Sequence, residues 1–230
     1  MGVASVPTMG ATADRKPTLI LLHPAGRGGR TWRKVAPLFS DAFDVLTPDL
    51  PGFADRPGPF RMSTATREIA EVAAAHNPPV AIVGLSLGGS VAASVAAEHP
   101  HLVSRLAMSA PAIRSTGHER VIRWYRRVPG WLVRRVTDLP DRAAWLALVD
   151  ELVATDLTDT LPRISAPTLV LCGSRDTANL ADAHLAADTI ANARFLLVPH
   201  MGHAWPVTQP RLFAKIVTPF LTTSAPADRG

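Results

Sequence analysis

Six short runs of apolar residues are spread along the chain, and each has about the length of a β-strand. They are continuous rather than alternating, and they are rich in Leu, Ile and Val. The runs are Thr18–Leu22, Asp44–Thr47, Val80–Leu85, Arg105–Ser109, Thr168–Cys172 and Arg194–Pro199. Continuous apolar runs are typical of strands that are buried on both faces, as in a parallel sheet.

Segments with helical periodicity lie between most of these runs. The clearest are Thr31–Ser40, Thr64–His76, Gly89–Glu98, Leu180–Ile190 and Arg211–Leu221. Because strand and helix patterns alternate, we predict an α/β protein in which helices flank a mostly parallel central sheet.

The alternation is interrupted between Pro111 and Pro162, where no strand pattern occurs. Three short helices are expected there instead, at His118–Val128, Trp131–Asp138 and Asp141–Thr155. Helices inserted between two strands predict a short helical cap over one end of the sheet. We therefore divide the chain into a core of residues 1–111 and 164–230 and a cap of residues 112–163.

Composition narrows the class of protein. The chain has 230 residues, 47% hydrophobic and 19% charged, which suits one globular domain with a modest insertion. Only three of its 24 basic residues are lysines, and this usage suggests a bacterial source with a GC-rich genome. The net charge is +5, but no nucleic-acid-binding module is visible, so nucleic acid is not expected as a partner.

The sequence shows no sign of membrane insertion, secretion or a metal site. Residues 1–16 have no apolar core of signal-peptide length, and no stretch approaches the length of a transmembrane helix. A cytoplasmic protein is the resulting expectation. The single cysteine, Cys172, lies in an apolar run, so we expect a buried thiol and no internal disulfide. No metal-ligand spacing occurs, and neither a metal nor an organic cofactor is expected.

One serine lies where a predicted strand meets a predicted helix. Ser86, in Gly84-Leu85-Ser86-Leu87-Gly88, follows the third apolar run and precedes an Ala-rich helical pattern. A turn this tight strains the central residue and requires small neighbours. It also exposes the serine hydroxyl at the carboxyl edge of the sheet, where it is suited to act as a nucleophile.

A serine hydroxyl is a weak nucleophile until a base takes its proton. Asp176 follows the fifth apolar run and His203 follows the sixth, so both are expected at the same sheet edge as Ser86. His200 competes with His203 as the base, and we favour His203 because Gly202 gives the backbone freedom directly before it. Asp176 has an alternative role as a turn former or helix cap.

Other acidic and histidine residues fit these roles less well. Asp182 and Asp188 lie in a helical pattern, where a solvated face explains them. The remaining candidates lie in the cap or lack a matching partner: Asp150, Asp156, His23, His76, His99 and His101.

Acyl transfer also requires two backbone N–H groups that stabilise the developing oxyanion. Leu87, directly after Ser86, is expected to provide one. The other should come from the Gly-rich loop His23–Gly29, in which Pro24 has no N–H and Ala25 is the expected donor. A flexible loop without such a role is the alternative.

Taken together, these motifs resemble the α/β-hydrolase superfamily, in particular its small esterases, enol-lactonases and cofactor-free haloperoxidases. The matching segments are Leu21–Gly26, Pro48–Phe53, Gly84–Gly89, Pro167–Asp176 and Gly202-His203. The resemblance implies the α/β-hydrolase fold, a triad of Ser86, Asp176 and His203, and an oxyanion hole from Ala25 and Leu87.

The resemblance further implies cleavage of an ester or lactone bond in a small molecule through an acyl-enzyme, without a cofactor. A lyase, an acyltransferase or a haloperoxidase could use the same triad. A non-catalytic ligand-binding protein on this fold is a further alternative.

The predicted cap is short, which suggests an open site, and it is rich in arginine. Arg120, Arg123 and Arg127 lie on one face of the first cap helix, opposite an apolar face that includes Ile122 and Tyr125. The arginines form either a solvated face or a surface that attracts an anionic substrate, an acidic partner or a membrane. Trp124, Trp131 and Trp145 are expected either to line an acyl pocket or to pack in the core.

Overall fold

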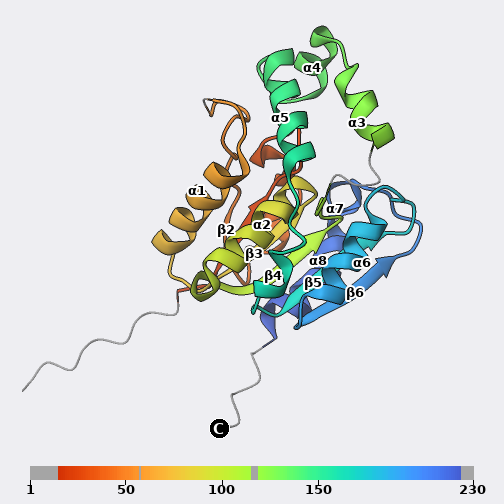
Figure 1. Ribbon diagram of the computed structural model, residues 1–230. Coiled ribbons are helices and arrows are strands. Elements are labelled where there is room, and N and C mark those ends of the chain that lie inside the picture. Colours follow the sequence, from red (N-terminus) through yellow and green to blue (C-terminus); the bar gives the residue numbers. More distant parts are fainter. Residues whose placement is uncertain (1–14, 57, 115–118, 224–230) are drawn as a thin grey trace, which may run out of the picture.

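A sheet of six parallel strands forms the centre of the computed structural model, which describes residues 15–56, 58–114 and 119–223 (Figure 1). The strands are β1 (Thr18–Leu22), β2 (Asp44–Leu46), β3 (Val80–Leu85), β4 (Val103–Ser109), β5 (Thr168–Gly173) and β6 (Ala193–Val198). All six predicted strands are confirmed. The central strands β1, β3, β4 and β5 are almost wholly buried, whereas the edge strands β2 and β6 are partly exposed.

The strand order is β2-β1-β3-β4-β5-β6. From β1 the chain continues to β2 on one side, whereas β3 lies on the other side of β1 and leads away to β4. The direction of winding therefore reverses between β1 and β3, whose last paired residues are Leu22 and Gly84. In parallel α/β sheets, such a reversal opens a crevice beyond the carboxyl ends of the two strands.

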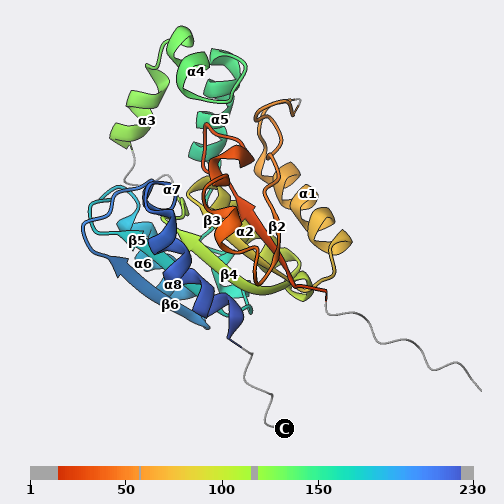
Figure 2. The same cartoon turned by 180° about the vertical axis from the view of Figure 1, so that it is seen from behind.

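Helices cover both faces of the sheet. On one face lie α1 (Met62–Ala75), α2 (Leu87–Glu98) and α6 (Leu180–Thr189), as Figure 1 shows. On the other face, seen in Figure 2, lies α8 (Pro210–Thr222), joined by the short α7 (Trp205–Thr208). Successive residues of β1 alternate between the two resulting cores: Ile20 joins the first, and Leu19 and Leu21 join the second.

The prediction of a helix over residues 31–40 is wrong. The chain there forms two short 3-10 turns, η1 (Gly29–Trp32) and η2 (Ala36–Leu38). Pro37 explains the difference, because a proline inside an α-helix has no N–H to donate and its ring clashes with the preceding turn. Two further 3-10 turns, η3 (Pro100–Leu102) and η4 (Leu161–Arg163), precede β4 and β5.

The insertion between β4 and β5 consists of α3 (Glu119–Arg126), α4 (Gly130–Val136) and α5 (Arg142–Ala154). These helices pack on one another and stand beyond the carboxyl ends of the strands (Figure 1). The three predicted cap helices are confirmed, although His118 lies outside the described residues. None of the helices in the described segments is long and apolar enough to cross a bilayer.

The expectation that Asp182 lies on a solvated helix face is wrong. Its side chain is 1% exposed. Its Oδ2 accepts hydrogen bonds from the backbone N–H groups of Ile113 (2.8 Å) and Arg114 (3.1 Å). A buried carboxylate on α6 thus holds the segment where the cap leaves the core. Asp188, on the same helix, is exposed as expected.

Candidate active site

Ser86 occupies the turn between β3 and α2. Its φ of 54° and ψ of −118° lie in a region that residues with a side chain rarely adopt. The N–H of Ser86 donates to the carbonyl of Ser109 on the neighbouring strand (2.9 Å), which holds the turn in place. Within residues 80–97, Ser86 is the only one that is not buried. The turn therefore presents this one side chain from an otherwise buried element.

Two glycines allow the turn to pack closely. A Cβ at Gly84 would collide with the backbone of Gly88, and a Cβ at Gly88 would collide with the backbone of Leu22 at the end of β1. The start of α2 consequently lies directly against β1. This close approach brings Ser86 beside the loop that follows β1.

Asp176 and His203 follow β5 and β6, and their side chains are hydrogen-bonded. His203 Nδ1 lies 2.7 Å from Asp176 Oδ2. The side chain of Asp176 is 4% exposed, whereas that of His203 is 40% exposed. Because the bond uses Nδ1, Nε2 is the nitrogen of His203 that can accept a proton from another group.

Asn179 is a member of this cluster that the sequence reasoning missed. Its Nδ2 donates to Asp176 Oδ1 (2.9 Å) and lies 3.1 Å from His203 Nδ1. The sequence does contain a signal, because an asparagine directly before a helical pattern is a typical helix cap. Here the side chain makes no capping bond to α6 and contacts Asp176 instead.

The pKa of the Asp176 carboxyl group lies below its ordinary value. Burial alone would raise this pKa, but the hydrogen bond and charge of His203, together with the hydrogen bonds from Asn179, outweigh burial. Asp176 is therefore ionised at neutral pH. An ionised carboxylate in this position can orient the imidazole ring and stabilise its protonated form.

Ser86, Asp176 and His203 line one cavity of about 290 Å³. Ala25 and Leu87, the two residues expected to donate backbone N–H groups, line the same cavity. In the described part of the chain, neither of these N–H groups has a hydrogen-bond acceptor. The structure thus brings all five predicted site residues to one cavity at the carboxyl edge of the sheet. Within the described residues, Ser86 and His203 form no hydrogen bond with each other.

His200, the competing base, does not line this cavity. It is exposed, its φ is 62°, and its backbone N–H donates to Ser174 Oγ (2.8 Å). These features give His200 a place in the turn after β6, away from Ser86.

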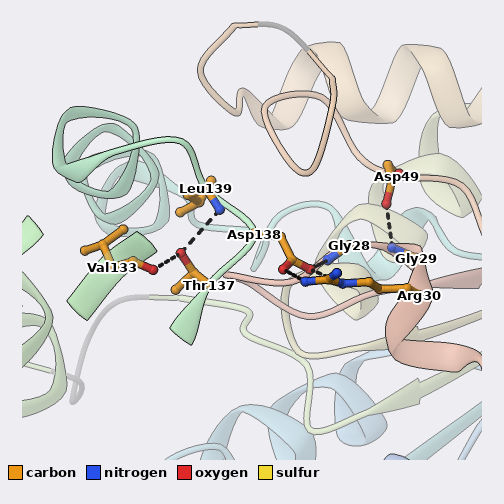
Figure 3. A network of polar contacts seen from close by, with 8 residues as sticks. All are labelled: Gly28, Gly29, Arg30, Asp49, Val133, Thr137, Asp138 and Leu139. Atoms are coloured by element: carbon orange, nitrogen blue, oxygen red, sulfur yellow. Dashed lines mark hydrogen bonds and ion pairs between the residues drawn. The ribbon is translucent and has the colours of Figure 1, made fainter. Parts of the chain in front are cut away.

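Two carboxylates hold the loop that carries Ala25, as Figure 3 shows. The backbone N–H of Gly28 donates to Asp138 Oδ2 (2.8 Å), and that of Gly29 donates to Asp49 Oδ1 (2.6 Å). Asp138 comes from the cap and Asp49 from the segment after β2. The loop is therefore fixed from both sides rather than flexible.

His23 fixes the start of the same loop. Its ring is buried, and its Nε2 accepts a hydrogen bond from the backbone N–H of Leu50 (2.9 Å). Its Nδ1 lies 3.0 Å from the carbonyl of Pro24, to which it can donate. Burial lowers the pKa of His23, so the neutral form with a proton on Nδ1 fits both contacts. Its role is structural.

The cap forms the roof of the cavity. Ile122 and Tyr125 of α3 contribute to it, together with Val149 and Leu152 of α5. The helical periodicity of α3 had placed Ile122 and Tyr125 on one apolar face. The α5 residues were not foreseen, because nothing in the sequence indicates which side of α5 faces the sheet.

The expectation for two of the cap tryptophans is wrong. Trp124 and Trp131 are 62% and 65% exposed, so they neither line the cavity nor pack in the core. Trp145 is buried, and its ring packs against that of Tyr125 with centroids 5.2 Å apart. Its indole N–H also donates to the carbonyl of Tyr125 (2.7 Å). Trp145 thus holds Tyr125 in place in the part of the cap that covers the cavity.

Across residues 15–56, 58–114 and 119–223, no group of three or more His, Cys, Asp or Glu side chains is arranged to hold a metal ion. Cys172 is fully buried, as expected, and burial raises the pKa of its thiol to about 12. Cys172 therefore serves as a packing residue in the interior of β5.

The fold is that of an α/β protein with a capped parallel sheet, and comparison with known proteins defines its family. Residues 19–216 match the model of the alpha/beta hydrolase family. The chain therefore belongs to this family, and the fold predicted from the sequence is confirmed.

Individual relatives agree with this membership. A pimeloyl-[acyl-carrier protein] methyl ester esterase of Aeromonas hydrophila is 28% identical in an alignment, gaps included, of 244 positions that covers 89% of this chain and 95% of the relative. A putative 2-succinyl-6-hydroxy-2,4-cyclohexadiene-1-carboxylate synthase of Bacillus subtilis is 25% identical, with 93% and 94% covered. The crystal structure of the enol-lactonase from Burkholderia xenovorans superposes with a TM-score of 0.76 at 22% identity, covering 93% of this chain and 94% of the other.

Proposed function

We propose that this protein is a serine hydrolase that cleaves an ester or lactone bond of a small molecule. Ser86 is the nucleophile, His203 the general base and Asp176 the residue that orients His203. The observation that carries the proposal is the hydrogen-bonded pair of His203 and Asp176 in the same cavity as the strained Ser86.

The proposed reaction has two steps. His203 Nε2 takes the proton of the Ser86 hydroxyl as its oxygen attacks the substrate carbonyl, and the N–H groups of Ala25 and Leu87 stabilise the oxyanion. When the tetrahedral intermediate collapses, His203 returns this proton to the leaving oxygen and an acyl-enzyme remains. Water then attacks the acyl-enzyme, with His203 again as the base, and releases the acid.

The relatives support an ester or lactone substrate. The name of the Aeromonas protein describes a methyl ester esterase, and the Burkholderia structure is that of an enol-lactonase. The Bacillus relative, named as a synthase, favours a second candidate, in which the same residues serve a non-hydrolytic reaction such as that of a lyase.

Active-site labelling with a fluorophosphonate probe tests whether Ser86 is reactive. The native protein should be labelled and Ser86→Ala should not, while Ser40→Ala, which changes an exposed serine, should be labelled like the native protein. Absence of labelling in the native protein contradicts the proposal.

Turnover of p-nitrophenyl esters and of lactones then separates hydrolysis from the lyase alternative. Ser86→Ala should lower kcat by on the order of 10^4-fold or more. A native protein that is labelled but hydrolyses none of these substrates favours the non-hydrolytic candidate.

A further inference from the structure

A second cavity, of about 460 Å³, opens beside the first. Ala25, Ser86, Tyr125 and His203 line both cavities, so the two meet at the proposed nucleophile and base. A substrate whose carbonyl lies at Ser86 can therefore extend in two directions, and the walls on these two sides differ in chemistry.

The wall of the second cavity is strongly basic. Four cationic side chains line it, all from the segment that follows β1: Arg27, Arg30, Arg33 and Lys34. The sequence contains no acidic residue between Asp14 and Asp41 that could neutralise them locally. We refer to this cavity as the basic groove.

The acid that lines the basic groove is already engaged. Asp138 accepts hydrogen bonds from the backbone of Gly28 and from the Arg30 guanidinium, with which it forms an ion pair. Arg27, Arg33 and Lys34 are exposed, and in the described part of the chain they make no ion pair. Arg30 and Asp138 offset each other, which leaves three cations whose charge is not compensated.

The first cavity is different. Its roof and walls are largely apolar, with Leu87, Ile122, Val149 and Leu152 among the lining residues. The cation that lines it, Arg114, is ion-paired with the buried Asp182 (3.5 Å). Leu87 lines this cavity and not the basic groove, whereas Ala25 lines both, and the apolar lining of this side suits an apolar acyl group. With the acyl group on that side, the leaving group would extend into the basic groove, which Ala204 and Val207 also line.

We propose that the basic groove binds an anionic group, a carboxylate or a phosphate, on the leaving-group part of the substrate. This inference rests on the proposed function and specifies its substrate class: an ester with an apolar acyl part and an anionic alcohol part. Guanidinium groups pair with both anions through two parallel N–H donors, and a lysine adds a mobile point charge.

The groove is open to water, so dissolved ions screen the attraction between each cationic side chain and a bound anion. At an ionic strength of about 0.1 M the Debye length is about 10 Å, which lets three clustered cations act on one anion inside the groove. Their effect should weaken steeply as salt increases.

Three aryl butyrates test the inference. They carry a carboxymethyl, a phosphonomethyl or a neutral carbamoylmethyl group in the para position, and the methylene keeps the leaving oxygens similar. The readout is the kcat/KM for each anionic ester divided by the kcat/KM for the neutral carbamoylmethyl ester. Partial unfolding of a variant cancels in this ratio.

At low ionic strength, the native protein should prefer at least one anionic ester by about tenfold, and the preference should approach unity in about 0.5 M salt. Whether the carboxylate or the phosphonate is preferred identifies the anion. In Lys34→Glu, the ratio should fall by about threefold or more, and in Arg33→Glu/Lys34→Glu the preference should reverse.

Lys215→Glu provides the matched control, because it makes the same charge change at an exposed residue of α8. Its ratio should remain that of the native protein. If the native protein hydrolyses the neutral carbamoylmethyl ester through Ser86 but prefers neither anionic ester, this inference is overturned and the proposed function is left intact. A protein that hydrolyses none of the esters and is not labelled by fluorophosphonate overturns both.

Discussion

The carboxylate of Asp138 accepts a 2.8 Å hydrogen bond from the backbone N–H of Gly28, three residues beyond Ala25. The backbone N–H of Asp138 also donates to the carbonyl of Gly26 (2.9 Å), and its side chain is only 5% exposed. One residue, two positions after the end of the second cap helix, therefore holds the loop that carries the proposed oxyanion donor. The geometry of this loop is coupled to the position of the cap.

Replacing Asp138 should impair catalysis through the loop. In Asp138→Ala the Gly28 N–H loses its acceptor, and we expect kcat for an ester to fall by about tenfold or more as the Ala25 N–H becomes less well aligned. Asp138→Asn keeps an acceptor oxygen and should lose less. Asp150→Ala, which removes an exposed cap carboxylate paired with Arg126, is the control for the change in charge. An unchanged kcat in folded Asp138→Ala would show that the loop does not depend on this bond.

Tyr125, the only tyrosine in the chain, lines both cavities. Removing its ring in Tyr125→Ala should widen the connection between the two cavities, and kcat/KM should shift toward esters with bulkier acyl groups. Tyr125→Phe keeps the ring against Trp145 and should retain the native selectivity. A panel of p-nitrophenyl esters of increasing size measures this shift, and identical selectivity in the alanine variant would argue against Tyr125 as a dividing wall.

His23 should make stability depend on pH. Burial lowers its pKa in the folded state below the value of 6.5, and the nearby Pro24 carbonyl and the Asp49 and Asp138 carboxylates only partly oppose burial. The unfolded chain therefore takes up this proton first as pH falls. The free energy of unfolding should then decrease below about pH 6.5 with a slope of up to about 1.4 kcal/mol per pH unit from this group, until the folded pKa is passed.

Urea unfolding at several pH values measures this slope. In His23→Gln the slope below about pH 6.5 should become shallower, because the variant has no proton to take up at this site. His101→Gln, which changes an exposed histidine, should keep the native slope. Equal slopes in His23→Gln and the native protein would contradict the assignment.

Asp182 should be important for stability. Asp182→Ala leaves the N–H groups of Ile113 and Arg114 without this acceptor, and each unsatisfied group costs about 1–3 kcal/mol. We expect a total loss of about 2–4 kcal/mol in the free energy of unfolding. Asp188→Ala, on the exposed side of the same helix, should change it by less than about 0.5 kcal/mol. Similar losses in both variants would mean that the buried carboxylate has no special role.

Cys172 should report global unfolding. With its thiol pKa raised to about 12 by burial, the thiolate fraction near pH 8 is on the order of 10^-4, and the buried sulfur is out of reach of a reagent. Reaction with a disulfide reagent should be slower in the native protein than in urea by on the order of 10^3-fold or more. Rapid modification under native conditions would show that β5 opens locally.

The sheet could be predicted closely because its central strands are buried on both faces, and this burial requires continuous apolar runs such as Val80–Leu85. The meeting of Ser86, Asp176 and His203 at one sheet edge could be predicted because each follows one of these runs. Asn179 and Asp138 could not, since their roles depend on contacts between segments far apart in the sequence. Asp182 shows the same limit: helical periodicity gives the face of a residue, but not the backbone N–H groups that approach it.

The late position of the proposed base along the chain bears on when activity can arise during synthesis. The residues proposed for catalysis follow β3, β5 and β6, and β6 is paired only with β5 at the far edge of the sheet. A nascent chain can emerge with the Ser86 turn, the cap and most of the sheet already translated and still lack the proposed base. The protein should therefore stay inactive on the ribosome until the segment that contains His203 has been made, and a message truncated before the codon for His203 should yield a product that cannot turn over substrate.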